Sequence, residues 1–199
     1  MRKVPRQARS RATVDRIITA GRRVLEREGY DALTTNRVAT EAGVSPGSLY
    51  QYFPDKAAIV ESVIAQWTID VADRVTAALA DRLDDVGPGT VRRVLDALVT
   101  ALEADAPLLR VVIEELPAGR NRPSLLALER RVREVATAYL AGLAPGTRYL
   151  GAASWVLVLS IEQLATRWIL DQPDISRDQL LAEMEALVTA YLTVRTSER

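Results

Sequence analysis

Apolar residues recur along most of the chain at the spacing expected for one face of a helix. Between residues 10 and 28 they are Val14, Ile17, Ile18, Gly21, Val24 and Leu25. Spacings of i, i+3, i+4 and i+7 predict an amphipathic helix over this segment. Similar series follow Asp55 and Ser176, whereas no window of useful length alternates with period two. The pattern predicts an all-α fold of about nine helices without a sheet.

Capping residues and helix breakers set the expected limits of these helices. A short helix is predicted over residues 34–42, and a tight turn at 43–45 separates it from a second short helix over 46–53. The second helix opens with Ser-Pro and is ended by Phe-Pro. Longer helices are predicted from Asp55 to the break at 84–89 and then at about 90–105, 107–116, 122–143, 147–171 and 176–195.

Two short helices joined by a glycine-containing turn, behind a basic amphipathic helix, predict a helix-turn-helix unit. The second helix of such a unit enters the major groove of DNA. Its expected outward groups are Ser45, Ser48, Tyr50, Gln51 and Tyr52, with Gly47 allowing a close backbone approach and Lys56 suited to a phosphate. Its expected inward groups are Leu49 and Phe53, packed on Val38, Ala39 and Val44. A helical hairpin without any DNA role accounts for the glycine turn equally well, but less well for this polar surface.

The net charge is zero, yet the charges are unevenly distributed. The 199 residues include 26 basic and 26 acidic side chains, of which residues 1–60 hold 11 and 6 and residues 61–199 hold 15 and 20. Within the first 23 residues, eight basic side chains accompany only Asp15. A basic end on an acidic chain favours a module that binds a polyanion, although a solvated, poorly ordered tail has the same composition.

Histidine and cysteine are both missing from the sequence. Their absence excludes His-dependent catalytic triads, disulfides and the usual zinc ligands, so we predict no catalytic residue, metal or cofactor. An enzyme that uses carboxylates or one of the two lysines, Lys3 and Lys56, is the least favoured class. The most apolar stretch, 150–161, is too short to span a membrane. We therefore expect a soluble, cytoplasmic protein.

Residues 34–56 read Thr-Thr-Asn-Arg-Val-Ala-Thr-Glu-Ala-Gly-Val-Ser-Pro-Gly-Ser-Leu-Tyr-Gln-Tyr-Phe-Pro-Asp-Lys. This segment resembles the DNA-binding signature of the TetR family of bacterial transcription regulators. The hallmark Ala-Gly-Val-Ser-x-Gly-x-Leu-Tyr-x-Tyr-Phe-x-x-Lys is matched at every fixed position, and the resemblance in motif covers about residues 10–60. Beyond them it is architectural, since long helices follow and the last two resemble the family's dimerisation pair. We expect a DNA-binding domain over 1–55 and an effector-binding and dimerisation domain over 56–199.

The resemblance implies DNA contacts for residues of the signature. Phosphate contacts are implied for Thr35, Tyr50, Tyr52 and Lys56, a base contact for Gln51, and a place near the DNA backbone or groove edge for Asn36 or Arg37. Bases or phosphate are implied as the partners of Ser45, Pro46, Gly47 and Ser48. Many relatives carry His at the position of Tyr52, whose phenol can also donate to phosphate.

A basic segment precedes the first helix. Its members are Arg2, Lys3, Arg6, Arg9 and Arg11. Such a segment is a candidate minor-groove arm, and diffuse attraction to DNA without a fixed contact is equally compatible with it.

A single recognition helix reads too few base pairs for useful discrimination, so we expect a symmetric homodimer on a palindromic operator. Helix 147–171 is apolar nearly all round and must be covered on several sides. With helix 176–195 it is the candidate interface, and burial wholly within one subunit is the alternative. The candidate interface residues are Val158, Ile161, Trp168, Leu180, Met184, Leu187 and Tyr191.

The resemblance also implies a small-molecule effector pocket among the middle helices. The candidate lining residues are Trp67, Val71, Arg110, Glu114, Tyr139, Trp155, Leu159 and Glu162. The tryptophans have an alternative as plain core, and Arg110 with Glu114 as a surface pair. We expect a bound effector to shift the helix after Asp55 and so change the separation of the two recognition helices.

The most favoured function is a homodimeric repressor that a small molecule releases from double-stranded DNA. The alternative is a helical small-molecule-binding protein with a vestigial DNA-binding module. Sequence-specific, salt-dependent binding to a palindrome distinguishes the two.

Overall fold

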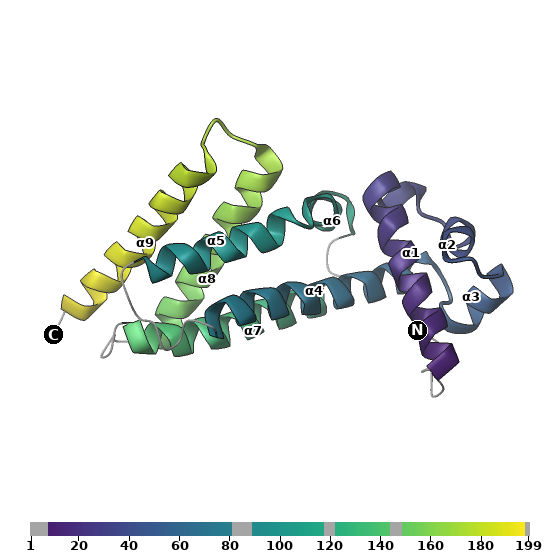
Figure 1. Cartoon of the computed structure of the whole chain (residues 1–199), viewed down its shortest axis with the longest axis horizontal. Coiled ribbons are helices and arrows are strands. Elements are labelled where there is room, and N and C mark those ends of the chain that lie inside the picture. Colours follow the sequence, from purple (N-terminus) through teal and green to yellow (C-terminus); the bar gives the residue numbers. More distant parts are fainter. Residues whose placement is uncertain (1–7, 81–88, 118–121, 144–148, 198–199) are drawn as a thin grey trace. The chain divides into compact units, whose positions relative to one another are not determined.

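The computed structural model describes residues 8–80, 89–117, 122–143 and 149–197 (Figure 1). Over these ranges the chain is helical and contains no strand. The helices are α1 (Ala8–Ala32), α2 (Thr35–Ala42), α3 (Pro46–Tyr52), α4 (Lys56–Ala80), α5 (Thr90–Glu103), α6 (Ala106–Arg110), a π-helical turn η1 (Val111–Glu115), α7 (Arg122–Leu143), α8 (Leu150–Asp171) and α9 (Arg177–Ser197). The all-α prediction is confirmed, and the segment expected as one helix over 107–116 is divided between α6 and η1.

The chain divides into two compact units that are not simply its two halves. The first unit comprises residues 1–68 and 107–125, and the second comprises 69–106 and 126–199. The first unit therefore extends beyond residue 55, where the sequence suggested the division. It takes in the first half of α4 and the segment that carries α6 and η1.

The first unit has a core built from every element of the predicted helix-turn-helix and its neighbours. Leu25, Val38, Leu49, Phe53 and Ile59 are each fully buried in it. Gly21 of α1 allows close packing on α4, because a Cβ there would lie 2.7 Å from the Ile59 Cγ2 atom. Gly21, seven residues after Val14 in the apolar series of the sequence, thus marks the place where α1 and α4 cross.

Capping groups hold the short helices at their predicted limits. The Thr34 hydroxyl accepts from the Arg37 backbone N–H at 3.3 Å, and the Ser45 hydroxyl accepts from the Ser48 N–H at 3.1 Å. Gly43, with φ of 63°, ends α2 in the left-handed conformation that glycine adopts without strain. These contacts satisfy backbone groups that short helices would otherwise leave exposed.

In the second unit, α5 packs against α8 and α9. Leu95, Leu157 and Met184 are among its buried side chains. Arg177 at the start of α9 pairs with Asp96 at 3.1 Å and with Glu103 at 3.6 Å, both on α5. The first residues of the helix predicted over 147–171 lie outside the described residues, and α8 is described from Leu150. None of the described helices is long and apolar enough to cross a lipid bilayer.

Candidate nucleic-acid interface and ligand cavity

The turn between α2 and α3, with the outer side of α3, forms a small polar surface. Its exposed members are Asn36, Ser45, Pro46, Gly47, Tyr50 and Gln51, and Ser48 is half-buried. The Ser45 and Ser48 hydroxyls lie 2.9 Å apart. Apart from Tyr52, the residues expected to face outward on α3 therefore do so at least in part.

A hydrogen bond joins the two helices of this motif on their polar side. The Thr35 hydroxyl on α2 lies 2.9 Å from the Tyr50 hydroxyl on α3. Both groups are predicted phosphate contacts, and the bond fixes the direction of the Tyr50 phenol before any ligand arrives. A hydroxyl can accept one hydrogen bond and donate another, so this pairing leaves capacity for a phosphate oxygen.

The sequence-based expectation that Tyr52 faces outward is wrong. Tyr52 is only 9% exposed and belongs to the buried side of α3. Leu49, Tyr52 and Phe53 lie at i, i+3 and i+4, which is the spacing of a single helical face. The helical period, and not the polarity of the hydroxyl group, decides the orientation of Tyr52.

Lys56 is half-buried and its ammonium group is engaged within the protein. Its Nζ atom donates to the Tyr30 carbonyl oxygen at 3.1 Å and lies 4.3 Å from the centre of the Tyr30 ring. The two contacts, a hydrogen bond and a cation–π interaction, tie the start of α4 to the end of α1. The candidate phosphate ligand therefore also has a clear structural role.

The peptide of Tyr30 is held from both sides by distant residues. Its N–H donates to the Glu115 Oε2 atom of η1 at 2.7 Å, while its carbonyl accepts from Lys56. Gly29, with φ of 79°, breaks α1 at this point, and a Cβ on it would lie 2.7 Å from the same Glu115 oxygen. We call this arrangement of Gly29, Tyr30, Lys56 and Glu115 the Tyr30 clasp. Sequence reasoning did not find Glu115, because no local pattern links residues 85 positions apart.

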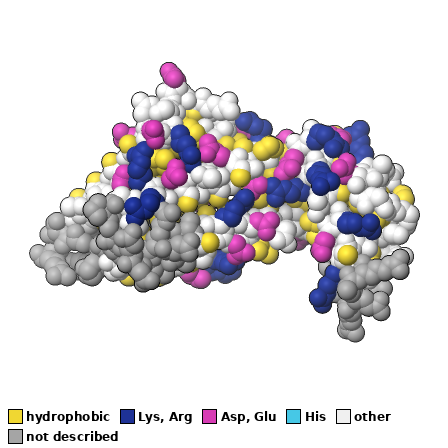
Figure 2. Space-filling view, viewed as in Figure 1, with side chains coloured by type: hydrophobic (Ala, Val, Ile, Leu, Met, Phe, Trp, Pro, Cys, Tyr) yellow, Lys and Arg dark blue, Asp and Glu magenta, His cyan; other side chains and the backbone are white. Residues whose placement is uncertain are grey.

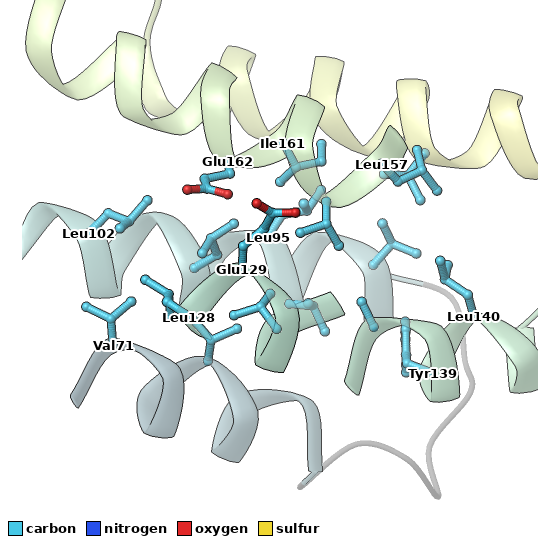
Figure 3. Close-up of a pocket in the computed structure, with 18 residues that line it drawn as sticks. Val71, Leu95, Leu102, Leu128, Glu129, Tyr139, Leu140, Leu157, Ile161 and Glu162 are labelled. Carbon is cyan, nitrogen blue, oxygen red and sulfur yellow. The ribbon is translucent and has the colours of Figure 1, made fainter. Parts of the chain in front are cut away.

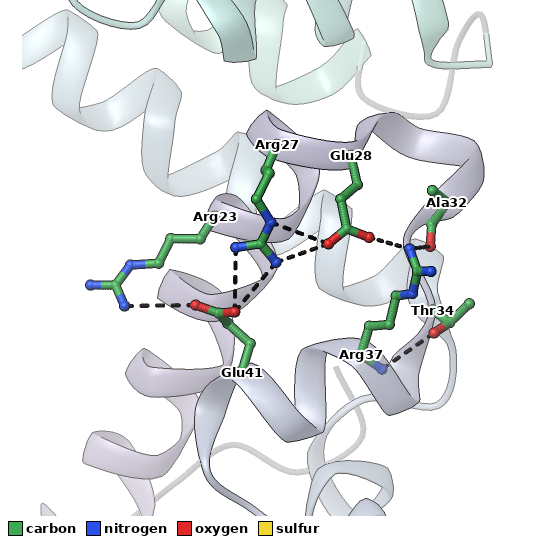
Figure 4. A network of polar contacts seen from close by, with 7 residues as sticks. All are labelled: Arg23, Arg27, Glu28, Ala32, Thr34, Arg37 and Glu41. Atoms are coloured by element: carbon green, nitrogen blue, oxygen red, sulfur yellow. Dashed lines mark hydrogen bonds and ion pairs between the residues drawn. The ribbon is translucent and has the colours of Figure 1, made fainter.

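An exposed ion-pair network joins α1 to α2 (Figure 4). Arg27 donates to Glu28 at 2.8 Å and to Glu41 at 3.4 Å, Arg23 lies 3.9 Å from Glu41, and Arg37 pairs with Glu28. The hydrogen bond from Arg27, with the nearby Arg37 charge, lowers the pKa of Glu28. The same bond raises the pKa of Arg27.

This network changes the meaning of the basic N-terminal composition. The guanidinium groups of Arg23, Arg27 and Arg37 are already matched by carboxylates. On the face drawn in Figure 2, acidic side chains likewise lie among the basic ones. Arg11 and Arg16 on α1 are exposed, whereas Arg2, Lys3 and Arg6 lie outside the described residues, as does the Arg9 side chain.

The second unit contains a cavity of about 130 Å³ between α4, α5, α7, α8 and α9 (Figure 3). Sixteen of its eighteen lining residues are Val, Leu, Ile, Ala or Tyr; they include Val71, Leu95, Leu102, Leu128, Tyr139, Leu140, Leu157 and Ile161. The remaining two are Glu129 of α7 and Glu162 of α8. The walls are therefore almost entirely apolar, as expected for a small-molecule site.

The structure brings three of the eight predicted pocket residues to this cavity: Val71, Tyr139 and Glu162. The other five lie elsewhere. Trp67 is buried in the first unit, and Arg110 forms an exposed pair with Glu114 at 3.2 Å. Trp155 and Leu159 are on the exposed side of α8, at 49% and 41% exposure. Size and aromatic character favoured the tryptophans in the sequence, but apart from Glu129, Tyr139 and Glu162 the lining residues are aliphatic.

Glu162 occupies an unfavourable electrostatic position in the cavity wall. Glu162 as a whole residue is exposed, yet its carboxylate lies among the apolar side chains of the wall, whose desolvation raises the pKa of Glu162, and the neighbouring charge of Glu129 raises it further. Glu129 itself accepts from the Arg133 guanidinium at 3.0 Å. The two carboxylates thus differ, because within the described residues Glu129 has a cationic partner and Glu162 has none.

An apolar groove runs along α8 and α9. It is lined by Leu164, Ile175, Leu180, Met184, Leu187, Tyr191 and Val194, among others. Leu180, Met184, Leu187 and Tyr191 are candidate interface residues from the sequence. Val158 and Ile161, by contrast, line the cavity described above, and the Trp168 indole N–H donates to the Ile175 carbonyl at 2.8 Å. Apart from Trp168, the candidate interface residues therefore fall into two groups: those that line the groove, and Val158 and Ile161 of α8, which line the cavity.

Two family models match the chain. Residues 17–63 match bacterial regulatory proteins of the tetR family, and residues 88–192, more than half of the chain, match the tetracyclin repressor-like C-terminal domain. The chain belongs to the TetR family. Its helix-turn-helix motif, α2 and α3, lies within the residues that match the first of these models.

Known relatives are similar over part of their length. The nucleoid occlusion factor SlmA of Haemophilus influenzae is 35% identical over 75 residues, which are 38% of this TetR-family chain and 32% of SlmA. The regulator UidR of Escherichia coli K12 is 22% identical over 135 residues, 68% of this chain and 66% of UidR. The chain therefore matches less than two thirds of either relative.

Solved structures share the fold over nearly the whole TetR-family chain. A TetR-family regulator from Mesorhizobium loti aligns with a TM-score of 0.73 at 20% identity, covering 94% of this chain and 98% of that one. A TetR-family regulator from Streptomyces coelicolor aligns with a TM-score of 0.64 at 27% identity, covering 92% of this chain and 99% of that one. The regulator FadR of Bacillus subtilis, solved in complex with stearoyl-CoA, aligns with a TM-score of 0.65 at 18% identity, covering 90% of this chain and 97% of that one.

Proposed function

We propose that the protein is a homodimeric repressor that leaves a palindromic operator when a small molecule binds its second unit. The polar surface of α3 carries this proposal. Tyr50 and Gln51 are exposed on a seven-residue helix whose opposite side is anchored by buried Leu49 and Phe53. A rigid helix with adjacent hydrogen-bonding side chains suits direct readout of base edges in the major groove.

The arrangement divides the DNA contacts into two kinds. The paired hydroxyls of Thr35 and Tyr50 suit phosphate oxygens, while the Gln51 amide suits a base edge. Gly47 at the head of α3 has no side chain to separate the backbone from DNA, and a Cβ there would meet only the Ser45 hydroxyl at 4.0 Å. Asn36, Ser45, Pro46 and Ser48 belong to the same polar surface, and we assign them supporting contacts. We assign a supporting contact also to exposed Arg37 of α2, whose guanidinium pairs with Glu28. The buried Tyr52 is not assigned a phosphate contact.

The groove on α8 and α9 supports dimerisation. Leu164, Ile175, Leu187 and Val194 are each at least 40% exposed, and they lie together along the groove. A large exposed apolar surface is typical of an interface. A two-fold axis through a helix pair of this kind gives a four-helix contact and two recognition helices for one palindrome.

Release requires that the effector bind one arrangement of the protein more tightly than the other. The cavity in the second unit is the proposed effector site, and the solved complex of the neighbour FadR with stearoyl-CoA shows that a protein of this fold binds a small molecule. The chain passes between the two units at residues 68, 106 and 125. Three covalent connections offer a route by which occupancy of the cavity biases the first unit.

The test begins with selection of bound fragments from random DNA by the purified protein. We expect a palindrome, and we expect binding to it to weaken steeply as salt rises. Gln51→Ala should change base preference at one position of each half-site, whereas Tyr50→Phe should weaken binding to all sequences alike. Enrichment of no sequence above non-specific levels would contradict the proposal and favour a ligand-binding protein with a vestigial DNA module.

A further inference from the structure

The cavity of the second unit combines apolar walls with charge of only one sign. Among its described lining residues there are two carboxylates and neither Lys nor Arg. We propose that its ligand is a small amphipathic organic cation, an ammonium group carrying a hydrocarbon or aryl portion. This inference rests on the proposed effector role of the cavity and specifies the chemical class of the effector.

Glu162 is the residue that selects charge. Figure 3 shows its carboxylate on α8 near that of Glu129 on α7, with aliphatic side chains around both. Glu129 is matched by Arg133 at 3.0 Å, so one negative charge in this wall is already compensated. For Glu162 the structure gives no cationic partner within the described residues, and its neighbour Glu129 repels it.

A ligand that carries a positive charge relieves this arrangement. A carboxylate in an apolar wall is costly when it lacks a counter-charge, and a charge-assisted hydrogen bond from an ammonium N–H compensates for the lost hydration. An anionic ligand would meet two like charges and no basic side chain among the described lining. A neutral ligand gains the apolar contacts but leaves Glu162 uncompensated. The wall therefore favours cations over the other two classes.

The size of the cavity limits the apolar portion. A volume of about 130 Å³ is close to the roughly 150 Å³ of an engineered apolar cavity that binds benzene. A single ring or a short alkyl chain therefore fits without movement of the helices. This suggests three matched probes with the same phenyl ring: 2-phenylethylammonium, 2-phenylethanol and phenylacetate.

Calorimetric titration of the full-length protein with each probe tests the proposal. We expect 2-phenylethylammonium to bind at least about tenfold more tightly than 2-phenylethanol, and phenylacetate to bind most weakly. Glu162→Gln keeps the shape of the side chain and removes its charge, so it should reduce the affinity for the ammonium probe by about tenfold. The affinity for 2-phenylethanol should stay within about twofold of that of the unmodified protein.

Glu134→Gln is the matched control, because Glu134 is an exposed residue of α7 outside the cavity lining. It should leave all three affinities unchanged. Failure of the ammonium probe to bind at millimolar concentration, tighter binding of phenylacetate, or an equal loss in Glu162→Gln and Glu134→Gln would each overturn the inference.

A parallel measurement of operator affinity separates this inference from the proposed function. If the ammonium probe binds through Glu162 yet leaves operator affinity unchanged, the ligand class stands and effector release by that ligand fails. If phenylacetate rather than the ammonium probe binds and releases the operator, effector release stands and the ligand class is wrong.

Discussion

The two units present their candidate sites in opposite ways. In the first unit the groups that suit DNA are polar, exposed and hydrogen-bonded to one another, as Thr35 and Tyr50 illustrate. In the second unit the candidate ligand site is lined mostly by aliphatic side chains, several of which also belong to the core, and Glu162 is its distinctive group. A surface site can therefore be altered without loss of packing, whereas a change to the cavity wall alters both packing and binding.

The largest effect is expected from Phe53→Ala. Phe53 is fully buried beneath α3, and truncation of a buried Phe costs about 3–5 kcal/mol of unfolding free energy. Urea denaturation should show the loss, and operator binding should fall with it. If the Phe53→Ala variant still binds 2-phenylethylammonium, the loss of stability is confined to the first unit and the cavity of the second unit does not depend on it. An unchanged urea midpoint would show that α3 does not depend on this anchor.

Gly29→Ala tests the Tyr30 clasp. At φ of 79° a side chain is strained, and the new Cβ would press on the Glu115 carboxylate at 2.7 Å. We expect a loss of about 1–3 kcal/mol in thermal unfolding. Gly142→Ala in α7 is the matched control, since a Cβ there meets nothing within 4 Å, and it should be neutral or slightly stabilising. Equal behaviour of the two variants would argue against strain at Gly29.

The bond between Thr35 and Tyr50 is open to a double-mutant cycle with Thr35→Val and Tyr50→Phe. We expect a coupling of about 0.5–1.5 kcal/mol in unfolding free energy, the range for one neutral hydrogen bond. Operator affinity should fall in each single variant. A coupling near zero would mean that the two hydroxyls face DNA independently.

Glu162→Gln should also reveal itself in the pH dependence of stability. Burial and Glu129 raise the folded-state pKa of Glu162 above its unfolded value, so the folded protein holds this proton more strongly. The resulting destabilisation is absent below the unfolded pKa and complete above the folded pKa. Relative to the unmodified protein, the Gln variant should therefore gain stability as pH rises through that interval. Denaturation at several pH values measures it, with Glu129 and its partner Arg133 left intact in both proteins.

The smallest effect is expected from Glu28→Gln on the exposed network of the first unit. The folded-state pKa of Glu28 is lowered by Arg27, so its contribution is present above the unfolded pKa and is lost as pH falls through the folded one. Exposed ion pairs are screened by salt. The difference from the unmodified protein should shrink at low pH and at high salt. A difference that survives molar salt would indicate a role other than charge pairing.

The sequence predicts the helices of the first unit well, because short helices are bounded by strong local signals. Thr34, Ser45, Pro46 and Gly43 each act where their side chains or backbone preferences indicate. Tyr52 shows the limit, since its hydroxyl suggested exposure while its position relative to Leu49 places it in the core.

The second unit is less predictable for a physical reason. Aliphatic residues that line a cavity are the same residue types, at the same helical spacing, as those that fill a core. The sequence therefore could not distinguish Leu95 or Leu128 from ordinary packing, and it favoured the larger Trp155, which lies on the surface of α8. Glu162 was identifiable because a carboxylate within an apolar helix is unusual.

Neither the capping signals nor the helical spacing of apolar residues predicts contacts between residues that are distant in the sequence. Glu115 and Tyr30 are brought together only by the fold. The sequence shows acidic residues that lower the net charge of the N-terminal part, but it does not show that Glu28 pairs with Arg27 and Arg37.

The Tyr30 clasp has a consequence for anyone who would exchange DNA-reading modules between related regulators. Residues 1–68 do not carry the whole first unit, because Glu115 is contributed by a segment that lies beyond α5 in the chain. A chimera joined after α4 would place a foreign side chain opposite Gly29 and leave the Tyr30 N–H to whatever that segment offers. A chimera that keeps the first unit intact needs residues 107–125 together with residues 1–68. The first unit must therefore be exchanged as two segments of the chain rather than one.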